Sequence, residues 1–131
     1  MTSGLTIKLQ MKAGQRLAVV NAPEGMAAVL ATRLPEVTVG VDLAGRADGV
    51  LAFVRSVEEA SRLVGKAIEA AGRKGLVWVA YPKGGSGVET ELNRDVLWKV
   101  VEPSGWRPVR LVALDEVWSA MRLRPADLVG R

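Results

Sequence analysis

Short apolar runs separated by Gly- and Pro-containing breaks make up most of the chain, a pattern typical of an α/β protein. Apolar runs predict six strands, at residues 16–22, 37–42, 50–54, 76–81, 108–114 and 117–123. The run at 76–81 is apolar on both alternating faces, as in a central parallel strand covered by helices on both sides. Near the N-terminus, apolar residues alternate with polar ones: Leu5, Ile7, Leu9 and Met11 are apolar, and Thr6, Lys8, Gln10 and Lys12 are polar. This alternation predicts a further half-buried strand or arm within residues 1–13.

Helical spacing of apolar residues predicts three helices, at residues 26–34, 57–71 and about 93–101. The helix at 57–71 has the clearest signals, because Ser56 and Glu59 form a capping box and Gly72 supplies a C-terminal stop. Pro35 ends the first helix, and Pro103 follows the last.

The linker between the strands at 37–42 and 50–54 is too short for a helical crossover. Extended, it spans about 20 Å, roughly one strand length, so the chain can return along the sheet without a helix. Right-handed crossovers then predict the strand order 2-1-3-4-6-5, with a C-terminal antiparallel hairpin around a turn at Asp115 and Glu116. We therefore predict a three-layer, mostly parallel, Rossmann-like α/β sheet in a single domain over residues 1–131, with a tail at 125–131. Because helices are missing on one side, its partly uncovered apolar face predicts a homodimer.

Composition narrows the classes of function. The 131 residues are 49% apolar, as in an ordinary globular domain, and no apolar run approaches the length of a membrane span. No secretory signal is apparent, so we expect a cytoplasmic protein. The chain has no Cys and no His, which excludes disulfides, Cys/His zinc sites and imidazole catalysis. We predict no metal site and no catalytic residue.

The net charge of +4 favours anionic partners, but the basic residues are scattered. They form short pairs, never a long run: Lys8 and Lys12, Arg73 and Lys74, Arg107 and Arg110, Arg122 and Arg124. A solvated surface is the simpler interpretation, and nucleic-acid binding is weakly signalled because no recognised motif accompanies the charge. Of the four tryptophans, Trp78 is predicted to be core, and Trp118 is predicted to be the more exposed, at a dimer surface or pocket rim.

The segment from Gly75 to Asp95 carries the main site prediction. A buried strand ends at Pro82, and a glycine-rich basic loop and the start of a helix follow it. In open α/β sheets, ligands bind in the crevice beyond the carboxyl ends of such strands. The predicted anion-binding crevice contains Lys83, Ser86, Thr90, Glu91, Arg94 and Asp95. The spacing is not that of a P-loop, and two structural alternatives stay open: a surface turn, and helix capping by Thr90 or Asn93.

A second candidate site follows the first strand. The turn from Asn21 to Gly25 has one glycine where a dinucleotide-binding motif has three. Asp42 closes the second strand about twenty residues on, where an acid can meet ribose hydroxyls. Asn21, Gly25 and Asp42 are therefore the alternative cofactor-binding residues, for S-adenosylmethionine or a nucleotide.

Four segments together resemble a family of small bacterial domains of unknown function: residues 54–56, 75–83, 88–95 and 118–122. The resemblance covers most of residues 12–125. One actinomycete member is implicated in transcriptional stress regulation through cysteines, a role that cannot apply to a chain without cysteine. The layout is also similar to the later half of a class I methyltransferase fold. We expect a non-enzymatic binding or regulatory module that needs no cofactor and takes a small anionic ligand or a protein partner; the alternative is a degenerate methyltransferase-like binder.

Overall fold

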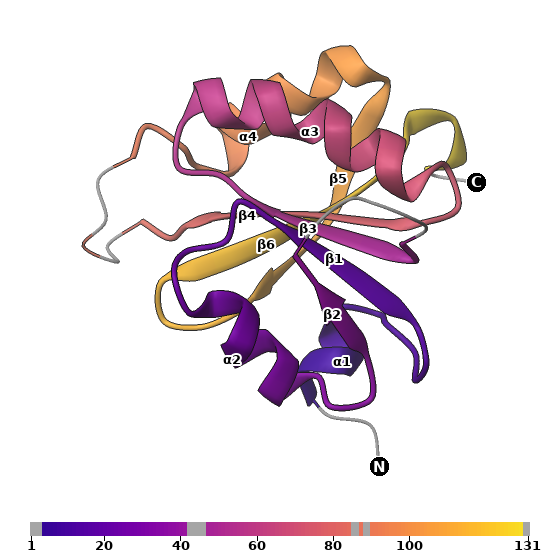
Figure 1. Ribbon diagram of the computed structural model, residues 1–131. Helices are drawn as coiled ribbons and strands as arrows, with labels where there is room; N and C mark the ends of the chain where they lie inside the picture. Colours follow the sequence, from indigo (N-terminus) through magenta and orange to yellow (C-terminus); the bar gives the residue numbers. More distant parts are fainter. Residues whose placement is uncertain (1–3, 42–46, 85–86, 88–89, 130–131) are drawn as a thin grey trace.

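A mixed sheet of six strands forms the centre of the molecule (Figure 1). The computed structural model describes residues 4–41, 47–84, 87 and 90–129. The strands are β1 (Arg16–Val20), β2 (Thr38–Gly40), β3 (Gly49–Phe53), β4 (Leu76–Pro82), β5 (Trp106–Ala113) and β6 (Trp118–Pro125). Their order is β2-β1-β3-β4-β6-β5, with β2, β1, β3 and β4 parallel and the β5–β6 hairpin antiparallel. The predicted fold class and strand order are confirmed.

Helices cover both faces of this sheet. Figure 1 shows α3 (Val57–Ala71) and α4 (Arg94–Val101) on one face, and α1 (Gly4–Lys8) and α2 (Met26–Arg33) on the other. Short 3-10 turns follow α4 and β6, at Glu102–Ser104 and Ala126–Leu128. Among the helices of the described residues, none combines the length and the apolar character that crossing a bilayer requires.

The helix α3 has the predicted bounds because its ends carry explicit signals. The Ser56 side chain accepts a hydrogen bond from the Glu59 amide at 3.1 Å, and Gly72 follows the last residue with a φ of 72°. One face of the helix, which includes Leu63, Val64 and Ala67, is buried against the sheet. The predicted helix is confirmed. Its first residues also bind two loops, because Asn21 donates to Glu59 and Glu91 accepts from the Val57 amide.

The core consists of two apolar clusters, one on each side of the sheet. The cluster under α3 and α4 contains alternate residues of the central strands, such as Val50, Val77 and Val79. The cluster on the α1 and α2 face contains Leu51 and Trp78. Because β3 and β4 are buried on both faces, they read as continuous apolar runs in the sequence.

The predicted strand near the N-terminus is wrong. Residues Gly4–Lys8 form a single helical turn, and Leu5 and Leu9, four apart, are buried while Ile7 is 63% exposed. The indole Nε1 of Trp78 donates a hydrogen bond of 3.1 Å to the Leu9 carbonyl. Packing against this apolar sheet face overrides the alternation in the sequence, and the N-terminal segment covers part of the face that was expected to be bare.

The predicted exposure of Trp118 is also wrong. Trp118 is only 5% exposed, because it packs edge-on against Phe53 with 5.0 Å between the ring centroids. The Arg55 guanidinium lies over the same ring, 5.5 Å from its centre. Trp98, on α4, is the tryptophan that stays half-buried.

Candidate functional site

The loop after β1 is tied to its neighbours by Asn21. Its backbone is left-handed, with a φ of 57°, a conformation that asparagine tolerates better than most residues. The side-chain Nδ2 donates to the Phe53 carbonyl at 2.9 Å and to Glu59 Oε2 at 3.2 Å. Asn21 therefore joins the carboxyl ends of β1 and β3 to the first turn of α3, at the point where the strand order reverses and open α/β sheets bind ligands.

A hollow of about 470 Å³ lies beside this loop, a volume in the range of small-molecule sites. It is lined by Val19, Asn21, Ala22, Pro23, Gly25, Ala27, Ala28 and Val41. We call it the β1 hollow. Gly25 is the N-cap of α2 with a φ of 80°, so the first turn of α2 lacks the side-chain cap that Ser56 gives α3 and Asn93 gives α4.

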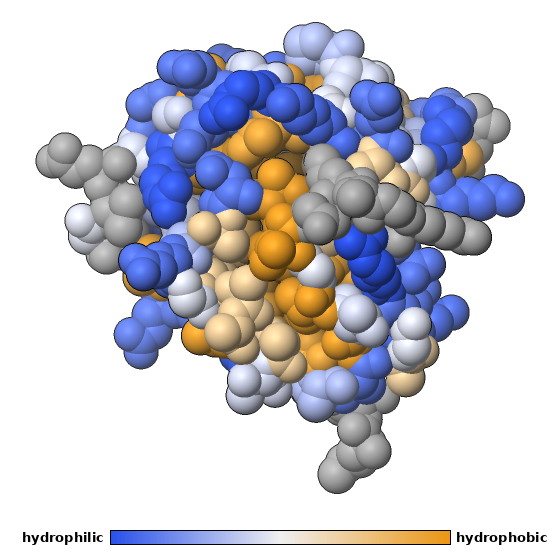
Figure 2. Space-filling view, viewed as in Figure 1, coloured by the Kyte–Doolittle hydropathy of each residue, from blue (hydrophilic) through white to orange (hydrophobic). Residues whose placement is uncertain are grey.

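The lining of the β1 hollow is mostly small and apolar. Figure 2 shows an apolar band in the middle of the face where Figure 1 places α2 and β2, with hydrophilic surface around it. Val41, after β2, is 70% exposed and Val29 of α2 is 49% exposed. Small side chains let a ligand approach the backbone closely, and apolar ones favour a ring system over a free anion.

Two of the three alternative cofactor residues meet in this hollow. Asn21 and Gly25 both line it, as the turn after the first predicted strand suggested. Asp42 lies outside the described residues, and the preceding residue, Val41, lines the hollow. Sequence reasoning missed Ala27, Ala28 and Val41, whose available signal was their position just beyond the carboxyl ends of the first two strands.

Lys83, from the predicted anion crevice, is held by the β5–β6 turn. Its Nζ donates to the Asp115 carbonyl at 2.5 Å, and Arg33 Nη1 donates to the Leu114 carbonyl at 2.5 Å. Both cations line a hollow on the α1 and α2 side of the sheet, which also includes Lys8. Their donors point at backbone carbonyls of the turn.

Thr90 and Glu91 contact the segment that leads into α3. Thr90 Oγ1 donates to the Arg55 carbonyl and accepts from the Leu92 amide at 3.0 Å. Glu91 Oε1 accepts from the Val57 amide at 2.9 Å, so it caps the start of α3. The N-cap of α4 is Asn93, as the capping alternative proposed, with its Oδ1 accepting from the Val96 amide at 2.9 Å.

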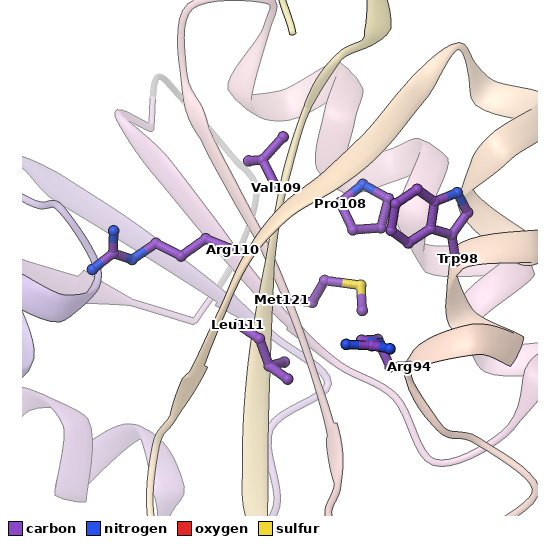
Figure 3. Close-up of a pocket in the computed structure, with 7 residues that line it drawn as sticks. All are labelled: Arg94, Trp98, Pro108, Val109, Arg110, Leu111 and Met121. Carbon is purple, nitrogen blue, oxygen red and sulfur yellow. The ribbon is translucent and has the colours of Figure 1, made fainter. Parts of the chain in front are cut away.

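Arg94 and Asp95 begin α4, and their side chains are 3.7 Å apart and well exposed. Arg94 lines a groove of about 250 Å³ between α4 and the β5–β6 hairpin, with Trp98, Pro108, Val109, Arg110, Leu111 and Met121. Figure 3 shows Arg94, Trp98, Pro108 and Met121 gathered on the α4 side of the hairpin, while the Arg110 side chain points away from them. Burial raises the pKa of the nearby Tyr81 hydroxyl, and the positive charge of Arg94 partly offsets that rise.

Of the residues predicted to form the crevice, the structure places Lys83 and Arg94 apart. The hollow that contains Lys83 and the groove that contains Arg94 share no residue and lie on opposite faces of the sheet. Thr90 and Glu91 are bonded to the backbone before and at the start of α3. Ser86 lies outside the described residues. Within the described ranges, no three carboxylate side chains gather in a group able to hold a metal ion.

Comparison with known proteins gives structural similarity only. No protein-family model matches the chain, and no curated relative matches it. The O-methyltransferase NcsB1 from neocarzinostatin biosynthesis, solved with S-adenosylmethionine and 2-hydroxy-5-methyl naphthoic acid, superposes with a TM-score of 0.65 at 14% identity. That match covers 94% of this chain and 53% of NcsB1.

Two further solved structures show the same likeness. CalO1, a methyltransferase of calicheamicin biosynthesis in its S-adenosylhomocysteine-bound form, has a TM-score of 0.64 at 15% identity, covering 92% of this chain and 52% of CalO1. The release-factor-specific protein-(glutamine-N5) methyltransferase of Alicyclobacillus acidocaldarius has a TM-score of 0.55 at 17% identity, covering 92% and 88%. This chain spans about half the length of the first three structures it matches. At these identities the likeness shows a methyltransferase-like, Rossmann-like fold.

Proposed function

We propose that this chain binds the adenosine part of S-adenosylmethionine or of a nucleotide in the β1 hollow. The observation that carries the proposal is that Asn21 and Gly25, singled out from the turn after the first strand, line one hollow at the carboxyl end of β1. The solved structures with the same fold support the choice of ligand, because NcsB1 was solved with S-adenosylmethionine and CalO1 with S-adenosylhomocysteine.

The residues of the hollow fit an adenosine group better than a phosphate. Val19, Ala27 and Val41 give an apolar wall for a purine ring, and Gly25 leaves its backbone open to the ligand. Asn21 Oδ1 takes no part in the two hydrogen bonds that the side-chain amide donates, so it can accept one from a ribose hydroxyl. The three-glycine cradle of dinucleotide sites is missing, which disfavours a bound pyrophosphate.

The proposal concerns binding, and it assigns no catalytic residue. S-adenosylmethionine, when bound, would supply an electrophilic methyl group, but none of the described side chains that line the β1 hollow is a general base. We therefore keep the interpretation of a binding or regulatory module and add to it an adenosine-containing ligand.

Isothermal titration calorimetry and thermal shift test the proposal. S-adenosylmethionine, S-adenosylhomocysteine, AMP and ATP are titrated in turn, and inorganic phosphate serves as the control for the crevice predicted around Lys83. A ligand at one hundred times its dissociation constant stabilises the fold by about 2.7 kcal/mol. We expect at least one adenosine compound to bind and phosphate to have no effect.

A matched pair of variants locates the binding site. Ala28→Trp fills the β1 hollow, whereas Ser61→Trp places the same side chain on the exposed surface of α3, on the other face of the sheet. We expect the first to abolish adenosine binding and the second to leave it unchanged. Equal binding by both variants, or no binding of any adenosine compound to the original chain, would contradict the proposal.

A further inference from the structure

Two arginine pairs that are separate in the sequence meet on the β5–β6 hairpin. Arg107 stands directly opposite Arg124, and Arg110 directly opposite Arg122. Partners directly opposite each other on neighbouring strands point to the same face, about 5 Å apart at Cβ. The hairpin therefore gathers four guanidinium groups, which we call the arginine face.

This face belongs to the α1 and α2 side of the sheet. Trp118 and Ala120, in the turn-proximal half of β6, are buried in the cluster on that side. Since side chains alternate along a strand, Arg122 and Arg124 point to the same side further along β6. Figure 3 shows Arg110 pointing away from the groove beside α4. On this side, the hairpin is therefore apolar near its turn, where the core buries Trp118 and Ala120, and cationic at its other end.

The arrangement is unfavourable for the isolated protein. Like charges directly opposite each other destabilise an antiparallel pair, and here two such pairs lie next to each other. Arg122 is half-buried, and its Nη1 donates to Gln10 Oε1 at 2.5 Å. Its Nε is buried and has no hydrogen-bond partner among the described residues. Burial lowers the pKa of Arg122, and the charges of Arg124 and Arg110 lower it further.

Among the residues that the structure describes, no carboxylate forms an ion pair with these four arginines. Arg73 pairs with Asp127 and Arg94 with Asp95, away from this face. Glu102 and Arg107 line a small hollow at the edge strand β5, but Trp106 of β5 is buried on the α4 side, so the next side chain, Arg107, points to the opposite face. Among the described residues the two form no ion pair. An anion from outside the chain is the group that would relieve the repulsion.

We propose that the arginine face binds the phosphate backbone of a nucleic acid. Arginine is suited to this role, because its planar guanidinium binds phosphate oxygens through two parallel hydrogen bonds. Arg122 and Arg124 are two residues apart on β6, about 7 Å along the strand, so successive guanidinium groups can meet different phosphates of one extended polyanion. A two-stranded ribbon also fits the major groove of duplex DNA, and the net charge of +4 has the required sign.

Fluorescence anisotropy with labelled 20-nucleotide single- and double-stranded DNA, over a series of salt concentrations, tests this inference. Arg107→Gln/Arg110→Gln removes two exposed cations of the face, and Arg62→Gln/Lys66→Gln removes two exposed cations from α3 as a matched control. We expect the first variant to weaken binding at least tenfold and to reduce the slope of log K against log salt by about 2, with a smaller effect of the control.

Three outcomes would overturn the inference: no binding of the original chain to either DNA at low salt, equal losses in the two variants, or equally tight binding of inorganic polyphosphate through the same arginines. Circular dichroism confirms that the variants fold. Both variants should bind adenosine compounds as the original chain does, so the result is independent of the proposal for the β1 hollow.

Discussion

Tyr81 gives a direct measure of the electrostatics at the carboxyl end of β4. It is 5% exposed, and burial raises its pKa above the ordinary value of 10.0. Since Tyr81 is the one tyrosine of the chain, absorbance near 295 nm follows its ionisation alone. We expect a midpoint above 10 in the folded protein and a higher one in Arg94→Ala, which removes the opposing positive charge.

The sign of the effect on stability follows from the same shift. A raised pKa means that the folded state holds the Tyr81 proton more tightly than the unfolded state, so the contribution is complete below pH 10 and is lost as the pH rises through the folded value. Tyr81→Phe should therefore reduce the fall in unfolding free energy above pH 10. A titration midpoint at or below 10 in the folded protein would contradict this account.

Replacement by alanine should have opposite effects on stability at two glycines, because only one of them has room for a Cβ. A Cβ at Gly75, between α3 and β4, would lie 2.2 Å from the Ala71 carbonyl oxygen, whereas a Cβ at Gly65, in the exposed middle of α3, meets nothing within 4 Å. We expect Gly75→Ala to cost about 1–3 kcal/mol and Gly65→Ala to gain about 0.5–1 kcal/mol. Urea unfolding measures both, and equal effects of the two changes would be inconsistent with this packing.

At the scale of elements, the N-terminal helix provides the clearest test. In a strand, Ile7 and Leu9 would share one face, but in the structure Leu9 is fully buried and Ile7 is 63% exposed. We expect Leu9→Ala to lower the unfolding free energy by about 2–5 kcal/mol and Ile7→Ala to change it by less than about 0.5 kcal/mol. Similar decreases of the unfolding free energy in the two variants would contradict the helix and favour the predicted strand.

The elements that the sequence predicts well are those whose signals are local. The capping residues Ser56 and Gly72 define α3, and the apolar run in β4 needs no information from elsewhere in the chain. The short turn of α1 could not be predicted in this way, because its helical form depends on contacts with Trp78, which is distant in the sequence. Trp118 was misplaced for the same reason, since Phe53 and Arg55 bury it.

At the scale of the whole molecule, the topology separates residues that the sequence places together. Lys83 and Arg94 are eleven positions apart, yet they lie on opposite faces of the sheet: Lys83 lies beside Arg33 and the β5–β6 turn, and Arg94 lies beside Trp98 of α4. Conversely, the hairpin joins Arg110 and Arg122, which the sequence separates. The turn with Asn21 and Gly25 was predictable because strand and helix flank it directly.

The homodimer stays a prediction, but the exposed apolar surface that supports it differs from the one that the sequence indicated. Leu5 and Leu9 cover part of the sheet face that was expected to be bare, so exposed apolar residues such as Val29 and Val41 are now the reason to expect association. Light scattering after gel filtration should give twice the chain mass of 14.0 kDa. A mass of 14.0 kDa at all concentrations would rule out the dimer.

The most direct test of ligand binding in the β1 hollow is a ¹⁵N-resolved NMR titration with S-adenosylmethionine and AMP. We predict that the shifted amides cluster at Asn21, Gly25, Ala28 and Val41, which surround the hollow. The amides of Lys83, Thr90 and Arg94 should stay unchanged. Shifts centred on those three residues, or no shifts at ligand concentrations in the millimolar range, would contradict the account.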